Sequence, residues 1–395
     1  MKRLLCINNG YPTNRNPQFT SYIKTIANCI EKSGVSVDLF VIEYNNKISL
    51  LNKSIKYIQF WFKAAYINLN IYDVIYINHL PFVWPILFNR LLDNKKVFVH
   101  WHGNDLISDS FFIKHTLNLI NKKSLGFKHI TPSQYFKEKL MEIMKYPSDD
   151  IYVSPSGGVN TTLFSPKLRP MSENVIIGYS ASLIKSKGAD LFLEIIKKKK
   201  EIEAICNKRI TFKAIDYGTE ATYYVDQYKN ATTDIEIIDK LPKDEMPSFY
   251  KYIDILVMPS LGESLGLVAL EAMSCNVPVV THNLCAFPEF VIPGISGELV
   301  DYCDDLNKRT ERFIDALIKI INNYADYKPT NIVNEKYSED IVVELYKKYS
   351  HDKRHFFLSH FTMVIFASYT FYSAINNLAY FLNLQFQSTI SSKDR

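Results

Sequence analysis

Residues 259–280 read PSLGESLGLVALEAMSCNVPVV, and this stretch decides the fold. The apolar residues 253–258 predict a strand before a glycine-rich turn, and helix-forming residues follow the turn. The first amide groups of a helix lack internal partners and lie at the positive end of its dipole, so this arrangement favours a phosphate. A carboxylate inside that helix, such as Glu271, can accept hydrogen bonds from a ribose diol. The alternative is a buried helix in which Glu263 and Glu271 are incidental.

Apolar runs alternate with helical patterns along most of the chain. In the first part, strands are predicted at residues 4–7, 35–42, 74–78, 97–100 and 129–131, and helices at 21–33 and 133–144. In the second part, strands are predicted at 175–179, 210–214, 235–238, 253–258 and 277–281, and helices at 189–200, 244–252, 267–275 and 307–324. The Pro-, Gly- and Ser-rich residues 155–170 predict a linker between the two parts. Such alternation predicts an α/β protein with parallel sheets, which bind ligands outside the carboxyl ends of their strands.

Length and charge limit the class of protein. The chain has 395 residues, which is enough for two domains, and a formal net charge of +5. That excess is too small to indicate a nucleic-acid partner, and no nucleic-acid-binding motif accompanies it. The six cysteines form no C-x-x-C pair and are interpreted as free thiols in a reducing compartment. The N-terminus is interpreted as a first strand instead of a signal peptide, so a cytoplasmic location is expected.

The stretch at 259–280 resembles the signature of the family-four (group 1) retaining glycosyltransferases. The shared features are two glutamates separated by seven residues, a small glycine-containing loop, the triplet Glu-Ala-Met at 271–273 and Pro-Val-Val at 278–280. The resemblance implies the GT-B fold, in which two Rossmann-like domains face each other across the active site. It implies an N-terminal acceptor-side domain at residues 1–165, a nucleotide-sugar-binding domain at 171–334 and a crossover helix at 335–350.

The resemblance also implies roles for residues of the C-terminal domain. Glu271 would bind the ribose, Glu263 the hydroxyls of the donor sugar, and Lys187 the diphosphate. Backbone amides of the glycine-rich loop would hold the sugar and the phosphate, from Ser264, Leu265, Gly266 and Leu267. Ser182 departs from the pattern, because it stands where the family has an arginine, and Lys185 is near enough in sequence to substitute. Taken alone, Lys187 also fits an exposed loop lysine.

Two further elements come from the N-terminal part. The sequence His-Gly-Asn-Asp at 102–105 follows an apolar run and resembles the family's His-Gly-x-Asp element. By this resemblance, His102 contacts the donor sugar, and Asp105 orients the sugar or shapes the loop. Gly10, after the first strand, would allow a close backbone approach to the donor, and His79 is a candidate loop contact. A structural or metal-binding role for the histidines is the alternative, although two-residue spacing without further ligands is poor evidence for a metal.

The expected reaction is transfer of a hexosyl or N-acetylhexosaminyl group from a nucleotide-diphosphate sugar to a hydroxyl, with retention of configuration. No Asp-x-Asp motif occurs in the chain, which favours charge stabilisation without a metal, and no cofactor is expected. Two alternatives share the fold. One is a sugar-nucleotide epimerase, and the other is a non-catalytic membrane-associated scaffold, which the departure at Ser182 would suit.

A membrane surface is a further expected partner. Residues 356–387 contain no Asp, Glu, Lys or Arg and carry an apolar helical stripe, with basic residues just before them. Within the segment 351–395, this pattern predicts binding at an anionic bilayer, with packing on the N-terminal domain or spanning as alternatives. Lysines and aromatic residues also interleave at 53–63, which fits a core-facing helix with a solvated lysine face or a membrane contact. A lipid-linked glycan acceptor for bacterial surface polysaccharide, at the cytoplasmic face of the inner membrane, is therefore the working hypothesis.

Overall fold

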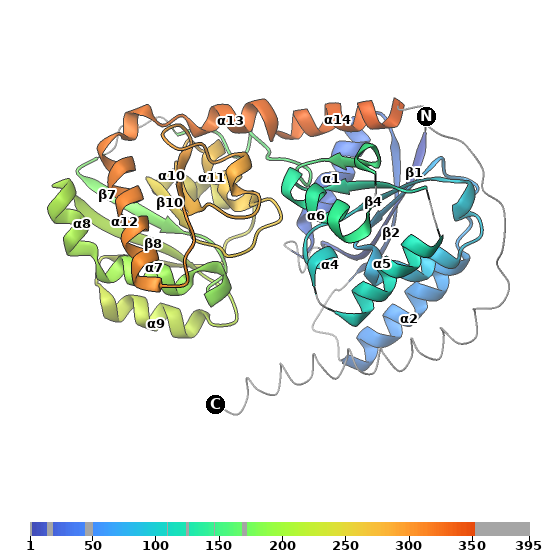
Figure 1. Cartoon of the computed structure of the whole chain (residues 1–395), viewed down its shortest axis with the longest axis horizontal. Coiled ribbons are helices and arrows are strands. Elements are labelled where there is room, and N and C mark those ends of the chain that lie inside the picture. Colours follow the sequence, from blue (N-terminus) through green and yellow to red (C-terminus); the bar gives the residue numbers. More distant parts are fainter. Residues whose placement is uncertain are drawn as a thin grey trace.

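The computed structural model describes residues 2–13, 19–43, 50–108, 110–123, 126–145, 147–167 and 172–351 (Figure 1). These residues form two α/β lobes, each built on a six-stranded sheet in which all the paired strands are parallel. The prediction of an α/β fold with parallel sheets is confirmed. The predicted apolar tail lies outside the described residues. Within them, no helix combines the length and the apolar character that crossing a bilayer requires.

The N-terminal sheet has the strand order β2-β1-β3-β4-β5-β6. Its strands are β1 (Arg3–Tyr11), β2 (Ser36–Glu43), β3 (Val74–Asn78), β4 (Lys96–His100), β5 (Lys128–Thr131) and β6 (Ile151–Val153). The helices of this lobe are α1 (Ser21–Lys32), α2 (Leu50–Tyr66), α3 (Leu80–Val83), α4 (Asn104–Ile107), α5 (Phe111–Lys123) and α6 (Gln134–Met144). Strand order reverses at β1, whose neighbours are β2 and β3, so the loops after β1 and β3 border a crevice of the kind that binds ligands.

The C-terminal sheet has the strand order β12-β11-β10-β7-β8-β9. Its strands are β7 (Asn174–Tyr179), β8 (Arg209–Asp216), β9 (Ile235–Asp239), β10 (Ile255–Met258), β11 (Val279–His282) and β12 (Gly297–Val300). Its helices are α7 (Ala189–Lys197), α8 (Lys199–Cys206), α9 (Ala221–Ala231), α10 (Met246–Tyr252), α11 (Leu267–Ser274), α12 (Leu306–Asn322) and α13 (Pro329–Lys336). This is the doubly wound order of Rossmann folds, and its switch point lies between β7 and β10.

Two segments of the chain connect the lobes, and they are hydrogen-bonded to each other. The Val159 N–H donates to the Tyr337 carbonyl at 2.8 Å, and Val159 also pairs with Ser338 in a parallel bridge. Gly158, at φ 74°, lies so close to Ser338 that a Cβ atom would be 2.8 Å from its backbone. Glycine is therefore required where the predicted linker, residues 155–170, crosses the returning chain.

The helix α14 (Glu339–His351) then returns to the N-terminal lobe, where Figure 1 shows it along the lobe's upper edge. It packs against α1 on the face of the sheet opposite α2. The buried side chains of this contact include Ile26, Ile30, Val342, Val343, Tyr346 and Tyr349. Burial of this apolar face explains why the amphipathic sequence folds back as a helix.

Candidate active site

The loops that follow β7 and β10 are held together at the switch point of the C-terminal sheet. Gly188 has φ 79°, and a Cβ atom there would lie 2.4 Å from Cγ of Pro259. The Leu261 N–H donates to the Ser186 carbonyl at 3.0 Å. Because only glycine fits this close contact, the two loops are fixed side by side.

Lys187 and Glu263 form an ion pair across these two loops. The Lys187 Nζ lies 2.5 Å from the Glu263 Oε1 and also donates to the Gly262 carbonyl at 3.1 Å. The Ser260 hydroxyl donates to the same carboxylate oxygen at 3.0 Å. The two charged side chains are 29% and 16% exposed, so a ligand can reach them from solvent. The structure brings two predicted site residues into direct contact, whereas the resemblance implied a separate ligand group for each of them.

Glu271 lies on α11 and is 8% exposed. Its Oε2 accepts a hydrogen bond from the Tyr250 hydroxyl at 3.4 Å, and its Oε1 lies 3.9 Å from the Lys243 Nζ. Burial raises the pKa of the Glu271 carboxyl, while Lys243 and Tyr250 act in the opposite direction. The helix begins after Gly266, at φ 94°, which has no side chain to cap it, so its first amides are suited to an anion.

We call the loops after β7 and β10, together with the start of α11, the C-terminal wall of the candidate site, and two further predicted residues lie in it. Leu265 is 2% exposed as a whole residue and its side chain is buried in the core beneath the loop, so contact between its backbone and a donor remains a prediction. The Ser182 hydroxyl lies 2.7 Å from the position that a Cβ of Gly218 would take, so Ser182 packs against the loop after β8. Its carbonyl accepts from the Tyr179 hydroxyl, which also donates to the Lys187 carbonyl, at 3.0 and 3.1 Å.

The second wall is the loop that follows β4. The backbone N–H groups of His102 and Gly103 both donate to the Asp105 Oδ1, at 2.9 and 2.8 Å. Asp105 is 1% exposed, and its Oδ2 lies 3.2 Å from the His79 Nδ1. Two roles were predicted for Asp105, orienting the sugar or shaping the loop. The geometry favours the second role, because the side chain points into its own loop and accepts two backbone hydrogen bonds there.

His102 is held in one tautomer. Its Nε2 lies 2.9 Å from the Asn78 Oδ1, and the Asn78 amide nitrogen donates towards the Ile7 carbonyl at 3.4 Å. The Asn78 oxygen is therefore the acceptor, and His102 Nε2 carries a proton. Burial, with smaller effects from His100 and His79, holds the pKa of His102 well below its ordinary value. His102 is thus a neutral imidazole whose Nδ1 is an acceptor.

Tilted aromatic rings surround His102. The ring centroids of His100, His79 and Tyr22 lie 4.2, 4.5 and 4.9 Å from that of His102. The Tyr22 hydroxyl lies 2.6 Å from the His79 Nε2. Burial lowers the pKa of His100 to about 3, so this imidazole is also neutral. Within the described part of the chain, no cluster of three or more His, Cys, Asp or Glu residues is arranged to hold a metal ion. Binding of the donor without a metal remains a prediction.

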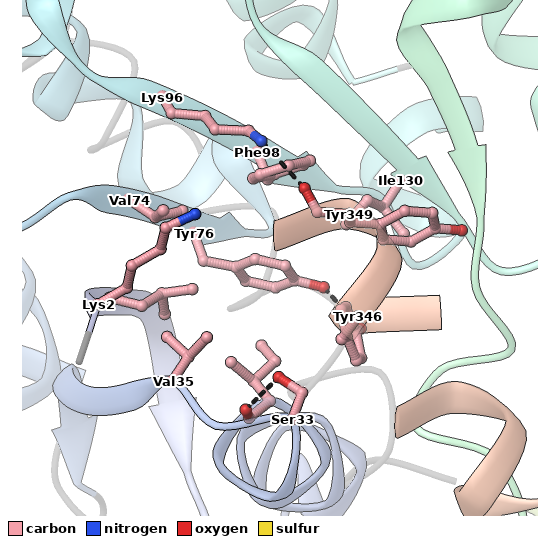
Figure 2. A pocket seen from close by; sticks show the side chains of 12 residues that line it. Lys2, Ser33, Val35, Val74, Tyr76, Lys96, Phe98, Ile130, Tyr346 and Tyr349 are labelled. Atoms are coloured by element: carbon pink, nitrogen blue, oxygen red, sulfur yellow. Dashed lines mark hydrogen bonds between the residues drawn. The ribbon is translucent and has the colours of Figure 1, made fainter. Parts of the chain in front are cut away.

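The ring cluster around His102 is connected to the crossover helix through Tyr76. The Tyr76 hydroxyl lies 2.8 Å from the His100 Nδ1 and 2.9 Å from the hydroxyl of Tyr346 on α14. Figure 2 shows the Tyr76–Tyr346 contact in the wall of an apolar pocket. This pocket is lined by residues at the starts of β1, β3 and β4, including Leu4, Val74 and Lys96. It therefore lies at the end of the sheet away from the His102 loop.

Gly10 was expected in a loop after the first strand. It lies within β1 instead, because this strand continues to Tyr11. A Cβ atom at Gly10 would be 2.5 Å from a ring carbon of Phe19. The close approach that glycine allows here is thus made by the Phe19 ring. Contact between Gly10 and a donor remains a prediction.

The two walls touch each other. Gly103, at φ 132°, lies against Ser264, and a Cβ atom at Gly103 would be 3.2 Å from the Ser264 Cβ. The Ser133 hydroxyl, at the start of α6, donates to the Ser264 carbonyl at 2.8 Å. Ser133 and Asn78 are site residues that the sequence reasoning missed. Asn78 ends the strand predicted at 74–78, and Ser133 comes just after the strand predicted at 129–131. A polar residue in such a position lies at the carboxyl edge of a parallel sheet, and this signal could have identified both residues.

Comparison with known proteins agrees with this geometry. Residues 160–337 match the family described as glycosyl transferases group 1. An uncharacterised 41.2 kDa protein in the cps region of Klebsiella pneumoniae is 28% identical over 180 residues, which cover 45% of this chain and 47% of that protein. An uncharacterised glycosyltransferase of Methanocaldococcus jannaschii is 28% identical over 238 residues, 59% of this chain and 61% of its own length. The chain thus spans about half the length of these curated relatives.

Solved structures extend the likeness to both lobes. A sucrose-phosphate synthase from Thermosynechococcus elongatus has a TM-score of 0.69 at 18% identity, covering 89% of this chain and 98% of that structure. The HepE protein of Anabaena, in complex with UDP and glucose, has a TM-score of 0.64 at 16% identity, covering 89% and 99%. Residues 160–337 therefore match the group 1 glycosyl transferases, and the described chain has the GT-B fold of its structural neighbours.

Proposed function

We propose that this protein is a family-four retaining glycosyltransferase, which moves a sugar from a nucleotide-diphosphate donor to a hydroxyl of a lipid-linked glycan. The observation that carries the proposal is the partly exposed Lys187–Glu263 pair at the switch point of the C-terminal sheet. The uncapped start of α11 and the buried Glu271 follow it in the sequence and share its wall. One wall thus offers a cation, helix amides and two carboxylates to a charged, hydroxyl-rich ligand.

Donor binding would exchange the partners of the ion pair. The diphosphate gains negative charge as it departs, and Lys187 and the amides of α11 stabilise that charge. When Lys187 turns to the phosphate, Glu263 is released to accept hydrogen bonds from the sugar hydroxyls. Glu271 accepts from the ribose, and Lys243, 3.9 Å away, favours its charged form. Each of these contacts replaces one that the protein already makes, so no buried charge is left unpaired.

The sugar would face His102 in the opposite wall. A neutral imidazole with a free Nδ1 accepts a hydrogen bond from a sugar hydroxyl and brings no charge to the reacting centre. For retention, we propose front-face substitution. The bond from the anomeric carbon to the phosphate oxygen breaks, and its electron pair stays on the phosphate. The acceptor oxygen bonds to the anomeric carbon on the same face, and its proton passes to the departing phosphate.

A membrane surface is proposed for the acceptor side, and α2 supports it. The inner face of this helix is buried through Phe60, and Trp61 donates its indole N–H to the Phe82 carbonyl at 2.8 Å. The outer face exposes an apolar stripe with helical spacing, made of Ile55, Ile58, Phe62 and Tyr66. The helix carries three lysines and no acidic residue, which suits an anionic bilayer. The core-facing alternative describes the inner face of α2, and a membrane contact is the proposal for its outer face.

The cellular location that we propose for the reaction builds on the proposed membrane contact of α2. We propose that the enzyme works at the cytoplasmic face of the inner membrane, in the assembly of a bacterial surface polysaccharide. The relative from a cps region supports this assignment. UDP-glucose is the first donor to test, because a structural neighbour holds UDP and glucose.

The test is a product assay with purified protein, UDP-, GDP- and ADP-sugars, and a bacterial lipid extract as acceptor. We expect a sugar bound to lipid, with NMR showing the anomeric configuration of the donor. Release of an epimerised nucleotide sugar without any acceptor would replace the proposal with an epimerase. An inverted product would refute retention, and no turnover with any donor would refute the enzyme.

A further inference from the structure

Glu289 of the C-terminal lobe caps a helix of the N-terminal lobe. Its Oε2 accepts the Gln134 N–H at 3.0 Å, and its Oε1 accepts the Tyr135 N–H at 2.8 Å. These two amides belong to the first turn of α6, where backbone donors have no partner within the helix. A carboxylate at this end also meets the positive end of the helix dipole. The two lobes are thus joined by a pair of charge-assisted hydrogen bonds.

The same helix end contacts both walls of the candidate site. Ser133 begins α6, and its hydroxyl accepts from the Phe136 N–H at 3.3 Å while donating to the Ser264 carbonyl at 2.8 Å. The Phe136 ring lies 3.8 Å from the position of a Cβ at Gly103, next to His102. A change in the position of α6 therefore changes where the His102 loop lies relative to the glycine-rich loop.

Two more contacts surround Glu289. The Tyr337 hydroxyl, in the segment that returns to the N-terminal lobe, donates to the Glu289 carbonyl at 3.3 Å. Cys285 has a left-handed backbone, with φ 54°, and its thiol lies beside the Tyr135 hydroxyl. Burial, followed by this neighbouring thiol, raises the pKa of Tyr135. Residues 285–289 therefore contact both the start of α6 and the segment that connects the lobes.

We propose that Glu289 is a positioning residue that favours the closed arrangement of the two lobes and so aligns the His102 loop with the donor loop. This inference rests on the proposed function for its catalytic consequence. The Glu289 side chain is partly exposed and Gln134 lies at the surface, so water can solvate both partners when the lobes separate. Glu289 then shifts the ratio of closed to open protein by about tenfold without locking the cleft.

The first test is hydrogen exchange of the full chain, measured by mass spectrometry on peptides that contain the start of α6. Glu289→Ala should raise exchange at the amides of residues 134 and 135 by about tenfold, and Glu289→Gln by less, because one amide oxygen remains as an acceptor. Glu142→Gln on the exposed face of the same helix is the matched control, with unchanged exchange. Unchanged protection in both Glu289 variants would overturn the proposal, and circular dichroism of Glu289→Gln checks that the fold is kept.

The second test is catalytic and separates a positioning role from a purely structural one. With UDP-glucose, or whichever donor the panel identifies, Glu289→Gln should lower kcat about tenfold and change KM for the donor less than about threefold. The ratio of donor hydrolysis to transfer should rise, because an open cleft admits water. A lower melting temperature with unchanged kcat and hydrolysis ratio would reduce Glu289 to a structural contact. If no donor is turned over, the proposed function fails, while the exchange result still decides whether Glu289 holds the start of α6 to the C-terminal lobe.

Discussion

Replacement of Lys187 by methionine separates the two roles that its ion pair with Glu263 can have, one in folding and one in donor binding. Methionine keeps much of the side-chain volume and removes the charge. The Nζ and Oε1 atoms are 2.5 Å apart, and with an effective dielectric constant of about 20 the Coulomb attraction is about 7 kcal/mol. That value is a ceiling, because desolvation and the ordering of two long side chains oppose it.

Because both side chains are partly exposed, we expect a net coupling of only about 1 kcal/mol in the free energy of unfolding. Urea unfolding of the wild type, Lys187→Met, Glu263→Gln and the double variant measures it as a double-mutant cycle. If Lys187 stabilises the departing diphosphate, its loss should cost about 3 kcal/mol in the transition state, and kcat should fall about 100-fold. The functional effect should therefore greatly exceed the effect on stability.

The control is Lys197→Met, which breaks a more exposed ion pair with Glu194, of 2.7 Å, on α7. It should change neither kcat nor the free energy of unfolding by a measurable amount. A coupling above about 3 kcal/mol for Lys187 and Glu263 would identify a structural clamp. Wild-type kcat in Lys187→Met would refute the assignment of the diphosphate to this lysine.

Three further predictions test other parts of the site. Gly103→Ala should lower kcat at least about tenfold. Alanine is strained at φ 132°, and its Cβ would lie only 3.2 Å from the Ser264 Cβ, so the loop must shift. Steady-state kinetics measure this effect, and a wild-type kcat would show that the contact does not matter for catalysis. Glu271→Gln should weaken UDP binding by about 1–3 kcal/mol in calorimetry. Because burial raises the pKa of Glu271 above its unfolded value, its charged form costs stability, and this cost develops as pH rises from the ordinary carboxyl range through the raised pKa. Urea unfolding at about pH 5 and about pH 8 should therefore show a smaller loss of stability with rising pH in Glu271→Gln than in the wild type. Phe62→Ser on α2 should weaken binding to vesicles of anionic phospholipid by about 1–2 kcal/mol. Ile205→Ser changes a similarly exposed apolar residue on α8 and should leave this binding unchanged. Equal effects of the two substitutions would exclude α2 as a specific contact.

The fold could be predicted from sequence where the period of the apolar residues and the positions of turn-forming Gly and Pro residues agree. Residues 253–280 give an apolar run, a glycine-rich turn and a helix, and the structure has β10, the loop and α11 there. Prediction failed where tertiary packing decides. The helix predicted at 189–200 is split into α7 and α8 at Lys198, whose ψ of 10° lies outside the helical range. The short strands β6 and β12 were not predicted, because three or four residues carry no readable period.

The candidate site was predictable residue by residue but not as a set of contacts. Motif likeness selects Lys187 and Glu263, yet their contact depends on Gly188 against Pro259, a loop-to-loop fit that no local pattern encodes. Likewise, the sequence left two roles open for Asp105. The choice between them came only from the direction of its side chain, which accepts two backbone amides inside the loop.

The two walls of the candidate site differ in charge, and this difference bears on how a donor would be oriented. The C-terminal wall carries the Lys187–Glu263 pair and Glu271, which suit a diphosphate and a ribose. The N-terminal wall presents His102, with the fully buried His100 behind it, and burial lowers the pKa of both imidazoles, so both are neutral rings. A charged imidazolium there would compete with Lys187 for the diphosphate and would pull the donor towards the N-terminal wall. Because neutral rings would not do so, we expect the charged end of a donor at the C-terminal wall and its uncharged sugar at the other.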